Sequence, residues 1–373
     1  MLIDIIAGAR PNFMKIAPII RALEARQTDG SPLSYRLVHT GQHYDKRMSG
    51  DFFDQLGIPA PHVNLEVGPG TQAEQTAAII VRYERLLLQA PSSLCLVVGD
   101  VTSTMACAIT AQKAHIPVAH VEAGIRSRDW SMPEEINRMV TDAITNWFFT
   151  TSENANEILR QTGVDEDRIF FVGNTMIDTL LYNRRRLRAP SFAHENALEP
   201  ASFFVLTLHR PSNVDSASRM KATLDAIAAG AEGRTVVFPV HPRTKRVLPE
   251  LEPLPTNICI VEPQPYLEFI WLVNNSMAVI TDSGGITEEA TVLGTPCITL
   301  RDTTERPETV EIGTNVLIGT DPEAIKPTLG RLLAGRWKHG AIPERWDGKA
   351  ATRIVAVLED VLGRAPVPPG SSS

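Results

Sequence analysis

Three ionisable residues stand at the ends of short apolar runs in this sequence of 373 residues. Asp100, Glu122 and His209 each follow a run of β-prone apolar residues by one or two positions. A carboxylate at the end of a buried run is unfavourable unless it has a partner or a task. Carboxylates and histidines are also the groups that most often move protons in enzymes. The pattern therefore predicts acid–base chemistry near Asp100 and Glu122.

Structural roles remain open for two carboxylates at this point. Asp100 precedes a helical pattern and has the residue type of a helix N-cap. Ser131 and Glu134 have the spacing of a capping box, with Pro133 tolerated in the first turn. The pattern alone does not assign Glu134 to catalysis.

The turn Gly8–Lys15 has the features of a weak anion site. Gly8 permits a tight turn and Pro11 suits a helix start, so Arg10 and Lys15 could reach an anion there. An ordinary strand–helix turn accounts for the same residues equally well.

A stronger anion signal follows an apolar run in the second half, where Ser283, Gly284 and Gly285 open a helix. Backbone N–H groups and the positive end of the helix dipole are free to bind a phosphate there. Glu289, or its neighbour Glu288, lies one turn on, where an acidic residue could bind ribose hydroxyls.

Further polar residues follow other apolar runs. His241 ends one of them, and Arg301 and Arg306 lie in the loop after another. Guanidinium groups in such a loop suit a diphosphate. Gln42 and His43 follow the second run, and a single histidine in such a loop is usually only a polar surface residue.

The elements that position these residues alternate between strand and helix patterns, which predicts an α/β fold with parallel sheets and helices on both faces. A stretch rich in Arg, Ala and Pro predicts a linker near 178–200, and 364–373 has the composition of a flexible tail. The predicted strands are Leu2–Ala7, Tyr35–Thr40, Leu94–Val98, Val118–Val121, Trp147–Thr150, Ile169–Val172, Phe203–Leu208, Thr235–Pro239, Ile258–Val261, Ala278–Thr281, Cys297–Leu300 and Asn315–Ile318. The predicted helices are Met14–Arg26, Gln72–Gln89, Ser103–Ala114, Glu134–Ile144, Ile286–Leu293 and Lys349–Leu362.

Composition excludes several classes of protein. The net charge is −7, which argues against bulk nucleic-acid binding. The four cysteines are scattered, with no CxxC, and are expected to be buried free thiols in a reducing compartment. No apolar run is long enough for a membrane span, and no signal peptide precedes the first strand pattern, so we expect a cytoplasmic protein. We expect neither a metal nor NAD, since no ligand cluster and no Gly-x-Gly-x-x-Gly turn follows the first strand.

Taken together, these motifs resemble the non-hydrolysing UDP-N-acetylglucosamine 2-epimerases. The resemblance implies a glycosyltransferase-B-like fold, with two Rossmann-like domains whose parallel sheets face a central cleft. Residues 1–177, completed by a last helix at 349–363, would form the domain on the sugar side, and 178–348 would form the UDP-binding domain. It also implies a homodimer. The matching stretches are Gly8–Pro18, Thr40–Tyr44, Gly99–Thr104, His120–Ser127, Pro133–Arg138, Thr207–Arg210, Thr281–Glu289, Thr304–Glu308 and Gly313–Gly319.

The resemblance also assigns roles to single residues. Those implied to contact UDP are Arg10, His241, Ser283, Gly284, Gly285, Glu289 and Arg306. Those implied to surround the sugar are Lys15, Asp100, Glu122, Glu134 and His209. Asp100 and Glu122 would exchange the C2 proton, with Glu134 supporting them and His209 near the leaving phosphate. The implied reaction eliminates UDP to leave a 2-acetamidoglucal and then adds UDP back, for precursors of bacterial surface polysaccharides.

The sequence departs from the family pattern at several positions. Asn12 stands where a glutamate is frequent, and Ser212 replaces the glutamate of a His-Arg-x-Glu-Asn motif. Some family members have a second, regulatory substrate site, to which Gln42, His43 and Gln72 correspond. Thr71 replaces an arginine of that site, which removes a diphosphate partner, so we expect weak or absent activation by the substrate.

Four other functions fit parts of this pattern. They are a hydrolysing 2-epimerase, a 2-epimerase of a 2,3-diacetamido UDP-uronic acid, a retaining glycosyltransferase of the same fold, and a UDP-sugar sensor without catalysis. A shared fold does not separate them. The three carboxylates Asp100, Glu122 and Glu134 favour proton transfer at C2 over glycosyl transfer or simple binding.

Overall fold

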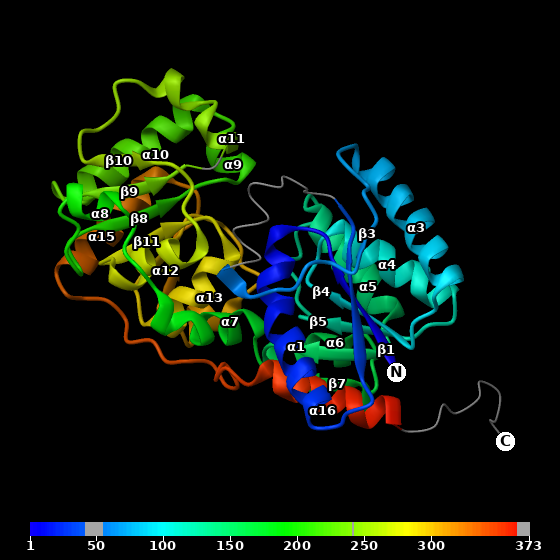
Figure 1. Cartoon of the computed structure of the whole chain (residues 1–373). Coiled ribbons are helices and arrows are strands. Elements are labelled where there is room, and N and C mark those ends of the chain that lie inside the picture. Colours follow the sequence, from blue (N-terminus) through cyan, green and yellow to red (C-terminus); the bar gives the residue numbers. More distant parts are fainter. Residues whose placement is uncertain (42–54, 241, 364–373) are drawn as a thin grey trace. The chain divides into compact units, whose positions relative to one another are not determined.

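The computed structural model describes residues 1–41, 55–240 and 242–363. Within them the chain forms two compact units (Figure 1). One comprises Met1–Tyr182 together with the segment that begins at Glu344, and the other comprises Asn183–Pro343. Each unit is a parallel sheet with helices packed on it, which confirms the predicted α/β class.

The sheet of the first unit has the strand order β3-β2-β1-β4-β5-β6-β7, and every pairing is parallel. Its central strands are buried along their whole length, which explains why they are continuous apolar runs in the sequence. The strand order reverses between β1 and β4, the position at which such sheets bind ligands. The strands are β1 (Leu2–Ala7), β2 (Ser34–His39), β3 (Val63–Asn64), β4 (Leu94–Val98), β5 (Val118–Val121), β6 (Trp147–Thr150) and β7 (Ile169–Phe171).

Helices cover both faces of this sheet, as Figure 1 shows. Helices α3, α4 and α5 pack in sequence against one another, whereas α1 packs against the last helix of the chain, α16. The helices are α1 (Arg10–Thr28), α3 (Gln72–Gln89), α4 (Thr102–Lys113), α5 (Pro133–Ile144), α6 (Glu153–Gln161), α7 (Thr175–Asn183) and α16 (Ala350–Gly363).

The C-terminal segment is an integral part of the first unit. The Asp178 carboxylate on α7 accepts hydrogen bonds from the backbone amides of Ala350 (3.1 Å) and Ala351 (2.7 Å) and so caps α16. The Trp346 side chain is buried, and its indole N–H donates to the carbonyl of Thr151 at 2.9 Å. These contacts explain why residues so distant in sequence belong to one unit.

The second unit repeats the same topology, with the strand order β10-β9-β8-β11-β12-β13. The reversal here lies between β8 and β11. Its strands are β8 (Phe204–Thr207), β9 (Val236–Pro239), β10 (Ile258–Val261), β11 (Ala278–Thr281), β12 (Cys297–Thr299) and β13 (Asn315–Leu317). Its helices are α8 (Phe192–Glu195), α9 (Pro211–Val214), α10 (Ala217–Gly230), α11 (Pro242–Lys245), α12 (Tyr266–Asn275), α13 (Gly284–Leu293), α14 (Pro307–Glu311) and α15 (Ile325–Leu333).

The predicted strands are confirmed within a residue or so at each end, and β3 is an additional strand of two residues. The chain leaves the first unit after Tyr182, inside the predicted linker region, and returns to it at Glu344. The predicted tail, 364–373, lies outside the described residues.

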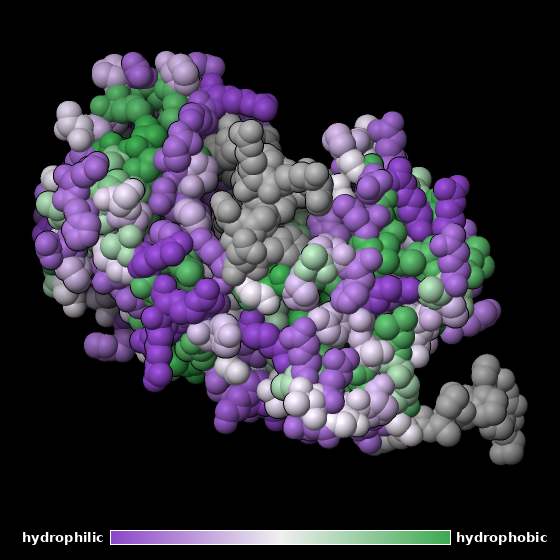
Figure 2. All heavy atoms as spheres, viewed as in Figure 1, coloured by the Kyte–Doolittle hydropathy of each residue, from purple (hydrophilic) through white to green (hydrophobic). Residues whose placement is uncertain are grey.

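One face of the molecule is mainly polar. Figure 2 shows hydrophilic residues over much of the visible face, with hydrophobic side chains in scattered patches. Across the described residues, no helix combines the length and apolar character that crossing a bilayer requires. Cys95, Cys107 and Cys297 are buried free thiols, whereas Cys259 is partly exposed.

Candidate functional site

An ion pair lies at the carboxyl ends of the central strands in the first unit. The Lys15 ammonium is 2.6 Å from the Glu122 carboxylate, and both side chains are more than nine-tenths buried. Lys15 projects from the first turns of α1, and Glu122 follows β5 directly. A buried ion pair is costly to desolvate and is retained only when the geometry is good. These two predicted site residues are therefore brought together.

The backbone at Glu122 is unusual and directs its side chain. Its φ is +73°, in the left-handed region that non-glycine residues seldom adopt. The amides of Glu122 and Ala123 both donate to the carbonyl of Phe149 on β6, which holds the turn in place. Such strain costs on the order of 1–3 kcal/mol and is typical of functional sites.

Gly99 provides room for the ion pair. Its φ is +68°, and a Cβ there would lie 3.1 Å from the Lys15 Nζ. A larger residue would press on the ammonium and would also be strained. The backbone conformation therefore favours glycine at the position before Asp100, and the close approach of Lys15 adds to this preference.

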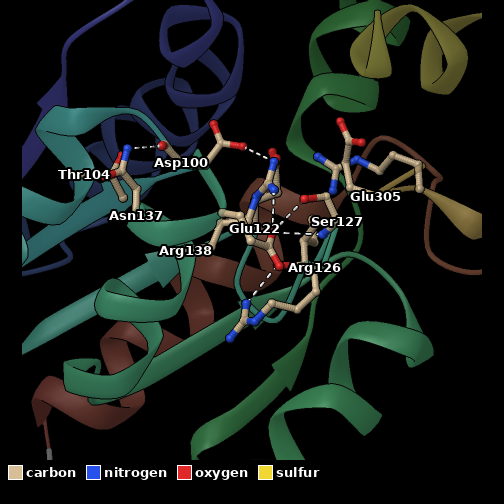
Figure 3. A network of polar contacts seen from close by, with 12 residues as sticks. Asp100, Thr104, Glu122, Arg126, Ser127, Asn137, Arg138 and Glu305 are labelled. Carbon is tan, nitrogen blue, oxygen red and sulfur yellow. Dashed lines mark hydrogen bonds and ion pairs between the residues drawn. The ribbon is translucent and has the colours of Figure 1, made fainter. Parts of the chain in front are cut away.

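A second charged group surrounds Asp100 (Figure 3). The Arg138 guanidinium pairs with the Asp100 carboxylate and, at 2.9 Å, with the carboxylate of Glu135 on the same helix. Asn137 donates to the backbone carbonyl of Asp100 at 2.8 Å. Helix α5 thus holds Asp100 from two directions. About a fifth of the Asp100 side chain is exposed, so the carboxylate can still reach a ligand.

Glu135 anchors the loop that precedes α5. Its carboxylate accepts from the amides of Ser127 and Arg128, both at 2.9 Å. Burial alone would raise the pKa of Glu135, but these amides and Arg138 hold the pKa below its ordinary value. Glu135 is therefore an ionised structural residue that orients Arg138.

Two structural interpretations from the sequence are wrong. Asp100 does not cap α4, because the N-cap is Val101 and Asp100 pairs with Arg138 instead. Ser131 and Glu134 form no capping box: the N-cap of α5 is Met132, and the Ser131 hydroxyl donates to Asp129 at 2.6 Å. Glu134 is partly exposed, and among the described residues its side chain makes no hydrogen bond or ion pair.

His120 ties the end of β4 to α5 from within the sheet. Its ring nitrogens lie 2.8 Å from the carbonyl of Gly99 and 2.7 Å from the Asp142 carboxylate. Burial would raise the pKa of Asp142, but the hydrogen bond and charge of His120, with Arg126, lower it. This buried contact fixes the turn that carries Asp100.

In the second unit, the N-terminus of α13 has the features of an anion site. Ser283 is the N-cap, and a Cβ on Gly284 would lie only 2.5 Å from a carboxylate oxygen of Glu305. Glu305 also accepts from Arg301 at 2.7 Å, and Arg301 is 5% exposed. A side chain at 284 would therefore displace the Glu305 carboxylate from this position, where Arg301 and a helix terminus attract negative charge.

Two further predicted nucleotide ligands, Arg306 and Glu289, lie on α13 or beside it. Arg306 pairs at 2.6 Å with Glu288, and both are buried. Glu289 accepts from the Tyr266 hydroxyl at 2.9 Å. Burial raises the pKa of Glu289 to about 8, Tyr266 opposes this shift, and the charge of Glu288 adds to it.

His209 lies at the point where the order of the second sheet reverses. It follows β8, and its Nδ1 is 2.9 Å from the carboxylate of Asp282, which follows β11. The His209 side chain is 44% exposed, whereas Asp282 is fully buried.

Four of the predicted site residues cannot be described fully, and a fifth lies at the start of α3. Gln42, His43 and His241 lie outside the described residues, as does the side chain of Arg10, whose backbone begins α1. Gln72 begins α3 and accepts from the Thr102 hydroxyl at 2.9 Å.

Asn12 has a structural task. Its side-chain oxygen accepts from the amides of Gly8 and Ala9, at 3.1 and 3.0 Å. Its amide nitrogen donates to the carbonyl of Val98 at 2.9 Å. Asn12, which stands where the family pattern has a glutamate, therefore links the turn after β1 to the end of β4.

Sequence reasoning missed the partners of the site residues, namely Arg138 and Asp282. One usable signal is the spacing of Glu135 and Arg138, which places opposite charges on one helical face. The other is the position of Asp282 directly after an apolar strand, which is the same signal that identified Glu122.

The chemistry available in each unit follows from these groups. The first unit presents ionisable carboxylates beside buried cations, which suits proton transfer. The second presents a glycine-rich helix terminus with arginines, which suits a diphosphate. Within 1–41, 55–240 and 242–363, no three His, Cys, Asp or Glu side chains are grouped so that they could hold a metal ion.

Comparisons with known proteins agree with this chemistry. Residues 25–359 match the family model described as UDP-N-acetylglucosamine 2-epimerase. The UDP-N-acetylglucosamine 2-epimerase of Methanocaldococcus jannaschii is 41% identical over 371 residues, covering 96% of this chain and 99% of that protein. The UDP-2,3-diacetamido-2,3-dideoxy-D-glucuronate 2-epimerase of Pseudomonas aeruginosa is 39% identical over 368 residues, with coverage of 96% and 99%.

Solved structures give the same result. The M. jannaschii UDP-GlcNAc 2-epimerase in complex with UDP-GlcNAc and UDP superposes with a TM-score of 0.84 at 40% identity, covering 96% of this chain and 99% of that one. The UDP-GlcNAc 2-epimerase of Neisseria meningitidis bound to UDP-GlcNAc has a TM-score of 0.87 at 29% identity, with coverage of 96% and 100%.

Proposed function

Because the chain belongs to the UDP-N-acetylglucosamine 2-epimerase family, we propose that it interconverts UDP-N-acetylglucosamine and UDP-N-acetylmannosamine without net hydrolysis. The observation that carries the proposal is the pair of carboxylates at the ends of two adjacent strands, Asp100 after β4 and Glu122 after β5. Each is held by a buried cation, Arg138 or Lys15.

The chemistry of the substrate explains why such groups are needed. The C2 proton is not adjacent to a carbonyl, so it is not acidic while the C1–O bond is intact. When that bond breaks, its electron pair leaves with the β-phosphate, and positive charge at C1 acidifies C2–H. A carboxylate takes the C2 proton, and a C1–C2 double bond forms, giving a 2-acetamidoglucal and UDP. Protonation of C2 from the opposite face and re-addition of UDP to C1 give the epimer.

The groups of the second unit serve the nucleotide in this proposal. Ser283, Gly284 and Gly285 supply backbone N–H groups to the diphosphate, as helix N-termini do. Arg306 adds a charge-assisted contact, and Glu289 binds the ribose hydroxyls. His241 and Arg10 complete the set that we assign to UDP. These groups stabilise the negative charge that grows on the departing UDP.

The groups of the first unit serve the sugar. One of the two carboxylates, Asp100 and Glu122, removes the C2 proton, and the other delivers a proton to the opposite face. Each such role raises the rate by about 10²–10⁴-fold. The Lys15 ammonium pairs with Glu122 and the Arg138 guanidinium pairs with Asp100, which fixes the position of each carboxylate. Glu134 is the third carboxylate among the residues that we assign to the sugar, and His209 acts at the leaving phosphate.

Incubation with UDP-N-acetylglucosamine in D₂O, followed by NMR, tests the proposal. We expect both epimers to gain deuterium at C2 and to be recovered as UDP-sugars, because the eliminated UDP is added back. Turnover that fully retains the C2 hydrogen would rule out the elimination. Release of free N-acetylmannosamine with stoichiometric UDP would identify a hydrolysing enzyme.

A second candidate substrate is a 2,3-diacetamido UDP-uronic acid, the substrate class in the name of the P. aeruginosa relative. The nucleotide contacts and the proton transfer at C2 would be the same, and only the groups facing C3 and C6 would differ. The two substrates are compared by kcat/KM at one enzyme concentration. A ratio far in favour of the uronic acid would replace the substrate named above and leave the reaction type unchanged.

We also propose the setting of this reaction, which is a cytoplasmic homodimer supplying precursors of surface polysaccharides. Activation by substrate is weak, because Thr71 stands where an arginine would meet a second diphosphate. An assay started from UDP-N-acetylmannosamine alone tests this. A lag that a trace of UDP-N-acetylglucosamine abolishes would contradict it.

A further inference from the structure

The contact between His209 and Asp282 joins the two strands at which the second sheet reverses its order. Strands β8 and β11 are hydrogen-bonded neighbours, with Thr207 opposite Thr281. His209 comes two residues after Thr207, and Asp282 comes directly after Thr281. The distance of 2.9 Å from Nδ1 to the carboxylate therefore spans the position where such sheets bind ligands.

Asp282 is ionised and fully surrounded by donors. Its carboxylate accepts from the amides of His209 (3.1 Å) and Arg210 (2.9 Å) and from the side-chain amide of Asn213 (3.0 Å). Burial alone would raise the pKa of Asp282, but the hydrogen bond and charge of His209, with Asn213 and Arg210, hold it below its ordinary value.

An ionised carboxylate can only accept hydrogen bonds, so Nδ1 of His209 must carry a proton. The ring is thus held in one orientation with a proton on Nδ1, and Nε2 is its second functional nitrogen. A carboxylate behind an imidazole also stabilises the ring when it becomes a cation. The His–Asp pair of serine proteases uses the same physical arrangement.

We propose that Asp282 is a positioning residue that holds Nδ1–H of the His209 ring and so aims Nε2 at the diphosphate. With the ring as an imidazolium, Nε2–H donates to the phosphate oxygen on which negative charge grows as the C1–O bond breaks, and no proton has to be transferred. This inference rests on the proposed function, because it needs UDP to be the leaving group. The bond that breaks, and the destination of its electron pair, are those of the elimination already described. Asp282 itself contacts neither the substrate nor the reacting atoms.

A merely structural Asp282 is the competing explanation, because the same carboxylate also holds the backbone after β8. Four proteins separate the two: Asp282→Asn, His209→Gln, the double variant, and Asp225→Asn. Asp225 is an exposed carboxylate of the same unit that pairs with Lys221, so its variant controls for the loss of a charge. Activity, UDP affinity by calorimetry and thermal unfolding are measured for each.

If Asp282 acts through His209, Asp282→Asn lowers kcat by about 10²-fold or more, while UDP affinity changes by less than about threefold. The double variant is then no slower than His209→Gln within about threefold, since the second change removes nothing further. Multiplicative losses, or a normal kcat in Asp282→Asn, would overturn the proposal.

A measurement on the unmodified protein covers the case in which Asp282→Asn does not fold. With ¹⁵N-labelled histidine, NMR identifies the ring nitrogen of His209 that carries the proton, with His209→Gln supplying the assignment. We expect an exchange-protected proton on Nδ1. A ring protonated only on Nε2 would refute the positioning role. Absence of epimerase activity in the unmodified enzyme, with a proton on Nδ1, would instead count against the proposed function alone.

Discussion

Lys15 and Glu122 form a buried ion pair in which the ammonium and carboxylate are 2.6 Å apart. The pair joins the first helix to the turn after β5, and the strained backbone at Glu122 aims the carboxylate at it. Desolvating both charges is unfavourable, and apolar pairs in place of buried ion pairs are often as stable or more stable. We interpret this cost as the consequence of placing Glu122 and Lys15 together at the proposed site of proton transfer.

Removing the charge of either first-unit carboxylate should stop proton transfer. We expect Asp100→Asn and Glu122→Gln to lower kcat by about 10²-fold or more, because each acts on the C2 proton. UDP affinity should stay close to that of the unmodified protein, and calorimetry checks it. The control is Glu359→Gln, which breaks a more exposed ion pair with Arg26 in the same unit and should leave kcat unchanged. Near-normal turnover in either variant would assign that carboxylate a structural role.

Arg306 should contribute directly to nucleotide binding. We expect Arg306→Ala to weaken UDP binding by about 1.5–3 kcal/mol, the value of a hydrogen bond to a charged group. The change also leaves Glu288 without its buried cation, which lowers stability for a separate reason.

The double variant Arg306→Ala with Glu288→Gln distinguishes these effects. It should regain thermal stability but not UDP affinity, because only the buried charge has been relieved. Unchanged UDP affinity in Arg306→Ala would remove this residue from the nucleotide site.

Glu289 should make the stability of the second unit depend on pH. Its pKa in the folded protein is raised by burial to about 8, whereas an ordinary glutamate has 4.5. Between these pH values the folded chain keeps a proton that the unfolded chain has lost, so the free energy of unfolding falls as pH rises. We expect Glu289→Gln to make the free energy of unfolding depend less on pH over this range.

Urea unfolding at several pH values between about 5 and 8 measures this slope. The exposed Glu250 provides the control, because Glu250→Gln should leave the slope as it is. An identical slope in Glu289→Gln would show that this carboxyl is not the group responsible.

Asp178 should stabilise the last helix. Its carboxylate accepts from the amides of Ala350 and Ala351, and loss of such a cap costs about 0.5–2 kcal/mol. We expect Asp178→Ala to lower the free energy of unfolding by this amount and to speed hydrogen exchange at both amides. Asp347→Asn removes an exposed carboxylate near the same helix and should cost less. Equal effects of the two variants would argue against a capping role.

Much of the fold is predictable because parallel strands buried on both faces read as continuous apolar runs. Leu94–Val98 is an example, and its sequence alone fixes both its type and its bounds. The two-residue strand Val63–Asn64 has no such signal, because its pairing depends on β2.

The candidate site is predictable to the same extent. Asp100 and Glu122 are identified by position, because groups after parallel strands lie at the ligand-binding edge. Their partners are not, since Arg138 reaches Asp100 only after α5 has packed. The expected capping box of Ser131 failed for a local reason: Asp129 competes for its hydroxyl.

The return of the chain to the first unit at Glu344 has a consequence for biosynthesis. A ribosome synthesises Asn183–Pro343 in full before it adds Trp346 and the helix that Asp178 caps. The inserted unit therefore has all its strands available while the earlier one still lacks its closing segment. During translation the first unit must wait for the second, and a chain that ended near 343 would expose the α1 surface that α16 covers.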